Sequence, residues 1–182
     1  MLFADWTLLR LFPPLRAMWA PVGAQAPVPI SGQNARRVLF GAINLRTAHR
    51  TVLIRRAAGQ RDAQAFLRDL RRRYRHAGTL WLFLDLASAH TAPATRRLAA
   101  TLGIAPLWLP KQHPELNPMD HLWRELTRLI AANRQAESID ALADGAAAWV
   151  LALTPAEARR KSGMAAHDFW LKHLLQDLWP GT

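Results

Sequence analysis

The hydrophobic pattern of the first third of the chain predicts strands. An almost wholly apolar segment of residues 1–12 stops at Pro13, because proline cannot continue a central strand. Residues 38–44 and 51–54 are apolar segments on either side of a polar turn, and they predict a hairpin. The segment from about Ala20 to Asn34 is rich in Pro, Gly and Ala and predicts a loop.

Helical spacing begins after the hairpin, and from there strands and helices follow one another. Residues 61–76 place apolar side chains on one face and arginines on the other, so we expect an amphipathic helix with a basic face. A strand over 80–85, a helix over 92–102 and a strand over 105–109 predict a right-handed parallel crossover. The remaining periodic segments predict helices over residues 117–133, 138–153, 154–163 and 167–179.

These elements together predict an α/β domain with a mixed sheet flanked by helices. We expect residues 1–135 to form the core of the domain, and residues 136–182 to form a C-terminal helical extension packed on the same domain. A chain of 182 residues that is 51% hydrophobic is long enough to bury one substantial core.

The charge balance favours a polyanionic partner. The chain has 24 basic and 13 acidic residues, a net charge of +11, and Arg accounts for 21 of the basic residues. Guanidinium groups bind phosphate in a bidentate fork, which fits nucleic acid, although a GC-rich genome explains an arginine bias equally well. The charge therefore raises the expectation of nucleic-acid binding without establishing it.

Cysteine content and hydropathy limit the remaining classes. No cysteine is present, so disulfides and thiolate sites are excluded, and a metal would have to be held by carboxylate, imidazole or backbone oxygen. No uncharged apolar stretch of about 18 residues or more occurs, and the N-terminus lacks the basic start of a signal peptide. We therefore expect a cytoplasmic protein with no membrane partner.

Two acids mark a candidate metal site. Asp85 ends the apolar run that begins at Leu80, and Asp120 follows with thirty-four residues between them, at the predicted start of a helix. A strand that is apolar on both faces would be buried, where an unpaired carboxylate costs several kcal/mol, so a cation should meet Asp85. An arginine could serve, but a second acid nearby adds repulsion that a divalent cation removes.

Each acid also has a simpler explanation when it is taken alone. Asp120 is then more readily a favourable charge near a helix N-terminus, after an Asn117 cap. Asp85 could accept backbone N–H groups in a turn, and Asp5 could mark a twisted edge strand. A match of all three acids to the spacing of a known family is what would favour a metal triad over these explanations.

Two segments carry a resemblance to one family. The stretch from Leu84 to His90, and the stretch from Leu109 to Trp123 with its Leu-Asn-Pro-Met-Asp motif, resemble the catalytic core of mariner-like transposases, especially the bacterial insertion-sequence branch. The resemblance implies a ribonuclease-H-like fold and three catalytic, metal-binding acids, Asp5, Asp85 and Asp120. It also implies two Mg²⁺ or Mn²⁺ ions, cleavage and strand transfer of DNA at transposon ends and target, a homodimer, and a bacterial, nucleoid-associated location.

Four positions depart from the family pattern. Trp6 stands where Glu often follows the first acid, Leu86 where Asn usually follows the second, Gln112-His113 where Tyr-Ser is common, and Asp120 where this branch more often has Glu. Because Leu86 removes a polar group beside the expected metals, an inactive remnant that only binds nucleic acid is one alternative. A hydrolytic nuclease that shares the fold without strand transfer is another. The family's helix-turn-helix modules do not precede the first acid, so we expect end recognition to lie outside these residues.

Further residues are predicted to support the site or to bind nucleic acid. We expect Asn117 to cap the helix of Asp120, and His90 and His113 to support the site without acting in catalysis. The predicted nucleic-acid contacts are Arg124, Arg128, Lys111, Arg71 and Arg72. Simpler alternatives are an ion pair between Arg124 and Asp120, and a solvated face for the arginines of residues 61–76.

Overall fold

The computed structural model describes residues 1–12, 19, 21–23, 34–131 and 136–172. Five strands form one sheet in the order β3-β2-β1-β4-β5. The strands are β1 (Leu2–Arg10), β2 (Arg36–Asn44), β3 (Arg50–Arg55), β4 (Leu80–Leu84) and β5 (Ile104–Trp108). Because β1, β2 and β3 pair antiparallel while β4 pairs parallel with β1 and β5, the sheet is mixed, as predicted.

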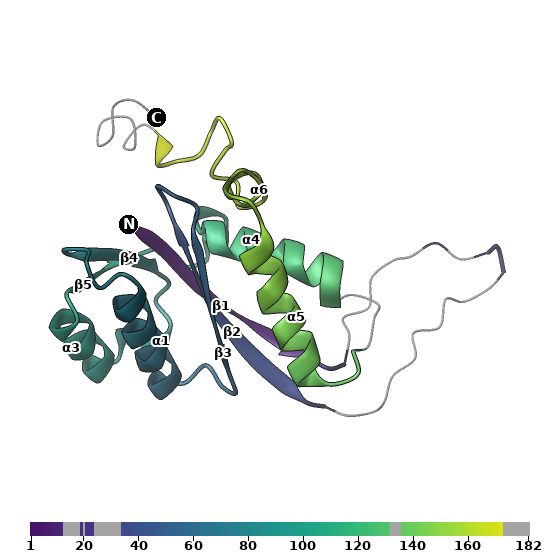
Figure 1. Ribbon diagram of the computed structural model, residues 1–182, viewed down its shortest axis with the longest axis horizontal. Helices are drawn as coiled ribbons and strands as arrows, with labels where there is room; N and C mark the ends of the chain where they lie inside the picture. The colour runs from purple at the N-terminus through teal and green to yellow at the C-terminus, as the bar shows by residue number, and fades with distance from the viewer. Residues whose placement is uncertain (13–18, 20, 24–33, 132–135, 173–182) are drawn as a thin grey trace.

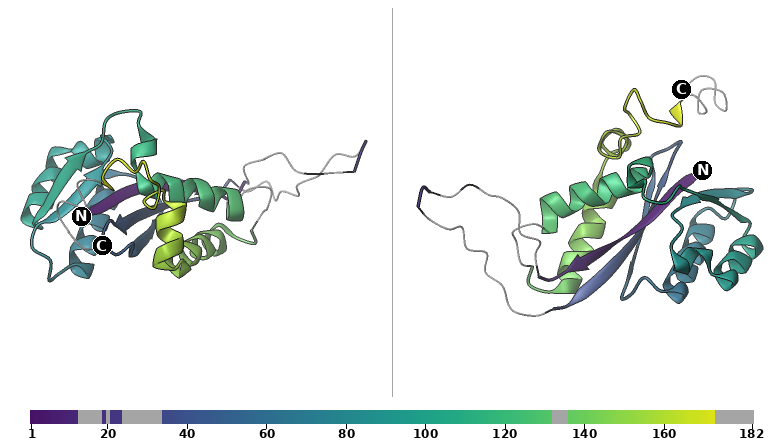
Figure 2. Two further views of the ribbon diagram at one scale, coloured as in Figure 1. Left: turned by 90° about the horizontal axis from the view of Figure 1, so that it is seen from above. Right: turned by 180° about the vertical axis from the view of Figure 1, so that it is seen from behind.

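Helices cover both faces of this sheet (Figure 1). They are α1 (Gln60–Arg73), α2 (Ser88–Thr91), α3 (Pro93–Thr101), α4 (Pro118–Leu126), α5 (Ile139–Ala152) and α6 (Pro155–Lys161). One layer holds α1 and α3 and the other holds α4 and α5, and the views of Figure 2 show the same division. Side chains of β1 alternate between the layers, because Phe3 and Leu9 join the apolar cluster of α4 and α5 while Leu2 and Ala4 join that of α1.

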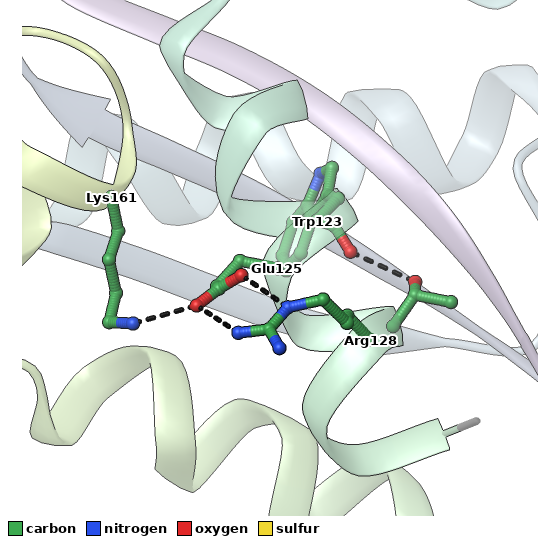
Figure 3. Close-up of polar contacts among 5 residues, drawn as sticks. Trp123, Glu125, Arg128 and Lys161 are labelled. Carbon is green, nitrogen blue, oxygen red and sulfur yellow. Dashed lines mark hydrogen bonds and ion pairs between the residues drawn. The ribbon is translucent and has the colours of Figure 1, made fainter. Parts of the chain in front are cut away.

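The observed boundaries differ from the predicted ones at several ends. β1 ends at Arg10, two residues before the predicted end. The helix predicted over 117–133 ends as α4 at Leu126 and continues as a π-helical turn, Thr127–Ala131. At this change of geometry the Thr127 hydroxyl donates a hydrogen bond to the carbonyl of Trp123, four residues earlier, at 2.9 Å (Figure 3).

Some predictions fall on short or undescribed segments. Residues 167–171 form turns in place of the predicted helix. The single turn α2 and the 3₁₀ turn Pro114–Leu116 were not predicted, because four and three residues are too few to show a period. Loop residues 20 and 24–33 and the predicted helical residues 132–133 and 173–179 lie outside the described residues. The division of the chain at residue 135 stays a prediction.

A network of ion pairs holds α6 on α4 (Figure 3). Glu125 accepts hydrogen bonds from Arg128 at 3.0 Å and from Lys161 at 2.8 Å, and these bonds, that of Arg128 first, lower the pKa of Glu125 to about 2. Lys161 also lies 5.7 Å from the centroid of the Trp149 ring in α5, at cation–π distance. The segment that follows α5 is thereby fixed to the helix that carries Asp120.

The C-terminal end of α5 is closed by a buried arginine from the start of β3. Arg50 donates hydrogen bonds to the carbonyls of Val150 at 3.1 Å, Leu151 at 3.0 Å and Leu153, and to that of Ala48 at 2.8 Å. Carbonyls in the last turn of a helix have no partner within it, so the guanidinium supplies the missing donors. Arg50 thus joins the β2–β3 turn to the far end of α5.

Many apolar residues of α5, among them Leu142 and Val150, are buried in the cluster beneath it. Within the described parts of the chain, we find no single helix of the length and apolarity needed to cross a membrane. The two helices α5 and α6 meet that test only as a pair bent by 108°.

Candidate active site

Asp5 lies in the middle of β1, on the face covered by α4. Its partner across β2 is Gly41, and no basic side chain among the described residues forms an ion pair with it. Burial raises the pKa of Asp5 to about 7, opposed by a hydrogen bond from the Trp6 backbone N–H and reinforced by the charges of Asp120 and Asp85. Asp5 is therefore the acid that most lacks a compensating positive charge.

Asp85 follows β4 directly and reaches the same end of the sheet as Asp5. Phe3 of β1 pairs with Phe83 of β4 in parallel register, and each acid comes two residues later, on the same face as its phenylalanine. The Asp85 side chain is 51% exposed. The expectation of a buried carboxylate at Asp85 was therefore wrong, because the strand ends one residue earlier and the acid with raised pKa is Asp5.

The Asp85 carboxylate has two neighbours from its own loop and from α2. The Ala87 N–H donates to Asp85 Oδ1 at 3.3 Å, and His90 Nε2 lies 3.5 Å from the same oxygen. The His90 ring is buried, and its Nδ1 has no hydrogen-bond partner among the described residues. Burial lowers the pKa of His90 and the Asp85 charge opposes this, so the imidazole is neutral near pH 7 and can orient the carboxylate without adding charge.

Asp120 comes from the first turn of α4. Asn117 caps this helix, as predicted, because its Oδ1 accepts the Met119 N–H at 3.0 Å, and Pro118 occupies the first helical position. Asp120 forms an ion pair with Arg124, 2.9 Å away and one turn later. The simpler role considered for Arg124 is therefore present, and at this exposure such a pair stabilises the helix by a few tenths of a kcal/mol.

Two residues beside Asp5 fix the start of α4, namely Ala4, which precedes it on β1, and Gly41, which lies opposite it on β2. The buried Asn117 side chain donates from Nδ2 to the carbonyl of Ala4 at 3.0 Å. Gly41 leaves room for the helix, because a Cβ at this position would lie 2.4 Å from Cζ2 of Trp123. Gly41 was not singled out from the sequence, although an isolated glycine inside a strand is a sign of close approach by another element.

The three predicted acids line one pocket. The cavity has a volume of about 450 Å³ and is bounded by Asp5, Asp85 and Asp120 together with Leu86, Asn117 and the segment 109–114. The acids come from three separate elements, namely a central strand, the loop after a neighbouring parallel strand, and a helix start. The structure therefore brings together at one end of the sheet what the sequence separates by more than a hundred positions.

The segment 109–114 supplies the exposed rim of this pocket. It contains Lys111, the predicted nucleic-acid contact that does line the cavity, and His113, whose Nδ1 lies 2.7 Å from Glu115 Oε1. Gln112 between them has a φ of 62°, a left-handed conformation that costs on the order of 1 kcal/mol for a residue with a side chain. The rim thus presents a lysine beside a strained residue at the mouth of an acidic cavity.

The donor groups fit a divalent cation in their chemistry. Carboxylate oxygens are the ligands that Mg²⁺ and Mn²⁺ prefer, and Asp5 is an acid whose ionisation is opposed by burial and by two like charges. Their positions, however, do not form a metal site, because no three Asp, Glu or His side chains in the described part of the chain converge closely enough to hold a metal. Asp120 is held by Arg124 instead.

The other predicted nucleic-acid contacts lie outside the pocket. Arg128 is paired with Glu125, and Arg72 with an acid of its own helix. Arg71 donates to four carbonyls of the turn after α1 and so closes that helix. Because α1 leads into the beginning of β4 whereas Asp85 follows its end, Arg71 and Arg72 occupy the opposite end of the sheet, and their contact with DNA stays a prediction.

Comparison with known proteins points to one family. The family model of the DDE superfamily endonucleases matches residues 1–143. The chain is also 26% identical over 138 residues to the "Insertion element IS630 uncharacterized 39 kDa protein" of Shigella sonnei, an alignment that covers 75% of this chain and 40% of that protein. The chain thus spans less than half the length of this curated relative.

Solved structures of the Mos1 transposase have the same fold. The Mos1 paired-end complex with left transposon end superposes with a TM-score of 0.71 at 18% identity, covering 89% of this chain and about half (51%) of that one. The catalytic domain of Mos1 mariner transposase gives a TM-score of 0.65 at 17% identity, covering 89% and 74%. These likenesses confirm the predicted ribonuclease-H-like fold.

Proposed function

The chain belongs to the DDE superfamily endonucleases, and from this premise we propose that it is the catalytic domain of a transposase. In this proposal it cleaves DNA strands and transfers 3′ ends with two divalent cations, Mg²⁺ or Mn²⁺. The similar Mos1 structures include a complex with left transposon end, one with Mg and one with Mn, which supports DNA and a divalent cation as the partners. A homodimer belongs to the same proposal.

One observation carries the proposal, namely that Asp5, Asp85 and Asp120 line a single pocket. We assign Asp5 and Asp85 to share the cations and Asp120 to hold the second. When bound, such cations activate water or a 3′ hydroxyl and stabilise the leaving oxygen of a phosphodiester. Since burial keeps the pKa of Asp5 near 7, this side chain has to give up a proton below that pH before it can act as a ligand.

Other residues of the pocket have supporting roles in this proposal. Lys111 at the rim contacts a DNA phosphate, because it is an exposed cation beside the acids. Asn117 holds the helix of Asp120 against β1, and His90 orients Asp85. Leu86 is 38% exposed at the pocket and contributes an apolar wall in place of a polar group.

Nicking of supercoiled plasmid DNA tests the proposal. We expect the protein to nick in the presence of Mg²⁺ and not of a chelator, and we expect Asp85→Asn to abolish nicking. This side chain is half exposed, so its replacement leaves the fold intact. Asp144→Asn is the matched control, because Asp144 is exposed on α5 outside the pocket.

Three outcomes would change the assignment. Full nicking by Asp85→Asn would remove this acid from the site. Retardation of DNA without cutting by the unaltered chain would favour an inactive remnant, the alternative to which Leu86 points. Cutting without joining of a pre-cut 3′ end would identify a hydrolytic nuclease.

A further inference from the structure

Five arginines gather where β1 ends, β2 begins and β3 ends. We call them the end patch: Arg10, Arg36, Arg37, Arg55 and Arg56. The strand register brings them together, because β1 pairs with β2 up to its last residue, and the last residue of β3 pairs with Val38 near the start of β2. A hollow of about 380 Å³ is lined by three of these arginines and by two acids, Asp62 and Asp140.

Positive charge in the end patch exceeds the negative charge available to it. Asp140 pairs with Arg37 at 2.7 Å and Asp62 with Arg55 at 2.8 Å. No carboxylate among the described residues pairs with the remaining three arginines, which are exposed. Five cations against two anions leave an excess of three positive charges. The two acids hold two guanidinium groups in place, and the other three groups, which no described carboxylate contacts, can bind an anion.

The strand register makes this excess unfavourable in the absence of a ligand. Arg10 and Arg36 are direct partners across the β1–β2 ladder. Like charges in that relation destabilise a sheet. Because Arg36 and Arg37 are consecutive strand residues, they point to opposite faces, so the end patch wraps around the end of the sheet. A polyanion bound there would relieve the repulsion.

The end patch lies beyond the acidic pocket along β1. β1 runs five residues from Asp5 to Arg10, and a strand rises about 3.3 Å per residue, so about 17 Å separates the two positions. β1 and β2 extend past β4 in this direction (Figure 1). Successive phosphates of one DNA strand are about 3.4 Å apart along the duplex axis, so about 17 Å corresponds to about five base pairs.

We propose that the end patch binds the phosphate backbone of duplex DNA about five base pairs from the phosphodiester held in the acidic pocket. This inference rests on the proposed function, because it takes the pocket as the place where DNA is cut. The two sites then engage one duplex together, and the end patch contributes affinity without touching the reacting groups. Binding there is independent of base sequence, since phosphates carry no sequence information.

Two double variants of equal charge change test this inference. Arg36→Gln with Arg56→Gln removes two exposed cations of the end patch that pair with no carboxylate in the described part of the chain. Arg75→Gln with Arg160→Gln is the control, because these exposed arginines lie after α1 and on α6, at the other end of the sheet. Affinity for a duplex of about 20 base pairs is measured at several salt concentrations without Mg²⁺, so the result does not depend on cutting.

The plot of log K against log salt has a negative slope. We expect the end-patch variant to reduce the magnitude of this slope by about 2, since each lost phosphate contact removes about 0.9. The control variant should leave the slope nearly unchanged. An equal fall in both variants would show diffuse attraction by net charge, and no fall in either would show an uninvolved surface. Both results overturn the proposal. Thermal unfolding without DNA should show the end-patch variant at least as stable as the unaltered chain.

A series of duplex lengths tests the link between the two sites. Affinity of the unaltered chain should rise steeply once a duplex is long enough to span both, at about 8 to 10 base pairs. The end-patch variant should show only the gradual rise that comes from more binding positions. If both proteins show the same gradual rise, the end patch does not act together with the pocket. Full nicking by Asp85→Asn, by contrast, would count against the proposed function alone.

Discussion

Replacing Asp5 by Asn should stabilise the metal-free protein above neutral pH. The pKa of Asp5 is raised from 3.8 to about 7, mainly by burial. The folded state therefore holds a proton that the unfolded state has lost between these pH values, so stability falls as pH rises from about 4 to about 7 and is constant above. Asparagine is nearly the same size and carries no charge, so this loss should disappear in Asp5→Asn.

The size of the effect follows from the shift. A rise of about 3 pH units is equivalent to at most about 4 kcal/mol, at about 1.36 kcal/mol per unit. Asp5 is only partly buried in a pocket open to water, so we expect about 2 kcal/mol. Only part of it should appear between pH 5 and pH 8, because the titration begins below pH 5.

Urea unfolding at pH 5 and pH 8 measures this difference. The unaltered chain should lose stability relative to Asp5→Asn on going from pH 5 to pH 8, and other titrating groups, such as His90, cancel between the two proteins. Adding Mg²⁺ at pH 8 should stabilise the unaltered chain and not the variant, because only the unaltered chain keeps the Asp5 carboxylate as a ligand. An equal pH dependence in both proteins would show that ionisation of Asp5 does not cause the loss of stability.

Three further substitutions test the contacts that place the site and the helices around it. Asn117→Ser keeps an acceptor for the cap but cannot reach the carbonyl of Ala4, so we expect a loss of about 1 kcal/mol in urea unfolding and a much larger fractional loss of nicking than Asp144→Asn shows. Gly41→Ala should cost about 1 to 3 kcal/mol by forcing α4 away, whereas Gly145→Ala, which meets nothing within 4 Å on α5, should be neutral or stabilising. Arg50→Lys should lower stability by about 2 kcal/mol in the same assay, because an ammonium group cannot serve the four carbonyls that the guanidinium reaches.

The strands and long helices followed from local pattern, and the exceptions have local causes. Pro13 correctly indicated that the first strand stops nearby, and Asn117 with Pro118 correctly indicated the start of α4. The change from α-helical to π-helical geometry at Thr127 leaves no trace in the hydrophobic period, so the pattern predicts one continuous helix where the structure has α4 followed by a π-helical turn. Asp85 was expected to be buried because the pattern locates a strand end only to within a residue or two.

The acids of the candidate site could be named from the sequence, but the contacts that position them could not. The three acids were identified through the resemblance to a known family, which the spacing of Asp85 and Asp120 and a short motif around Asp120 carry. The Asn117–Ala4 hydrogen bond joins residues 113 positions apart, and the space that Gly41 leaves for Trp123 depends on how a helix crosses a sheet. Such distant pairings are products of the tertiary fold, to which a single sequence gives no direct access.

The anchoring of α4 on β1 and β2 divides the acids into two groups. A slip of β1 by one residue against β2 would turn Asp5 toward the α1 layer and would also displace the Ala4 carbonyl that anchors Asn117, so the acid and the anchor of α4 would be lost together. Asp5 and Asp120 are consequently positioned relative to each other by the same packing of α4 on β1 and β2. Asp85, on the loop just past β4, is positioned separately, by the Ala87 N–H and the His90 ring, through contacts in which α4 takes no part.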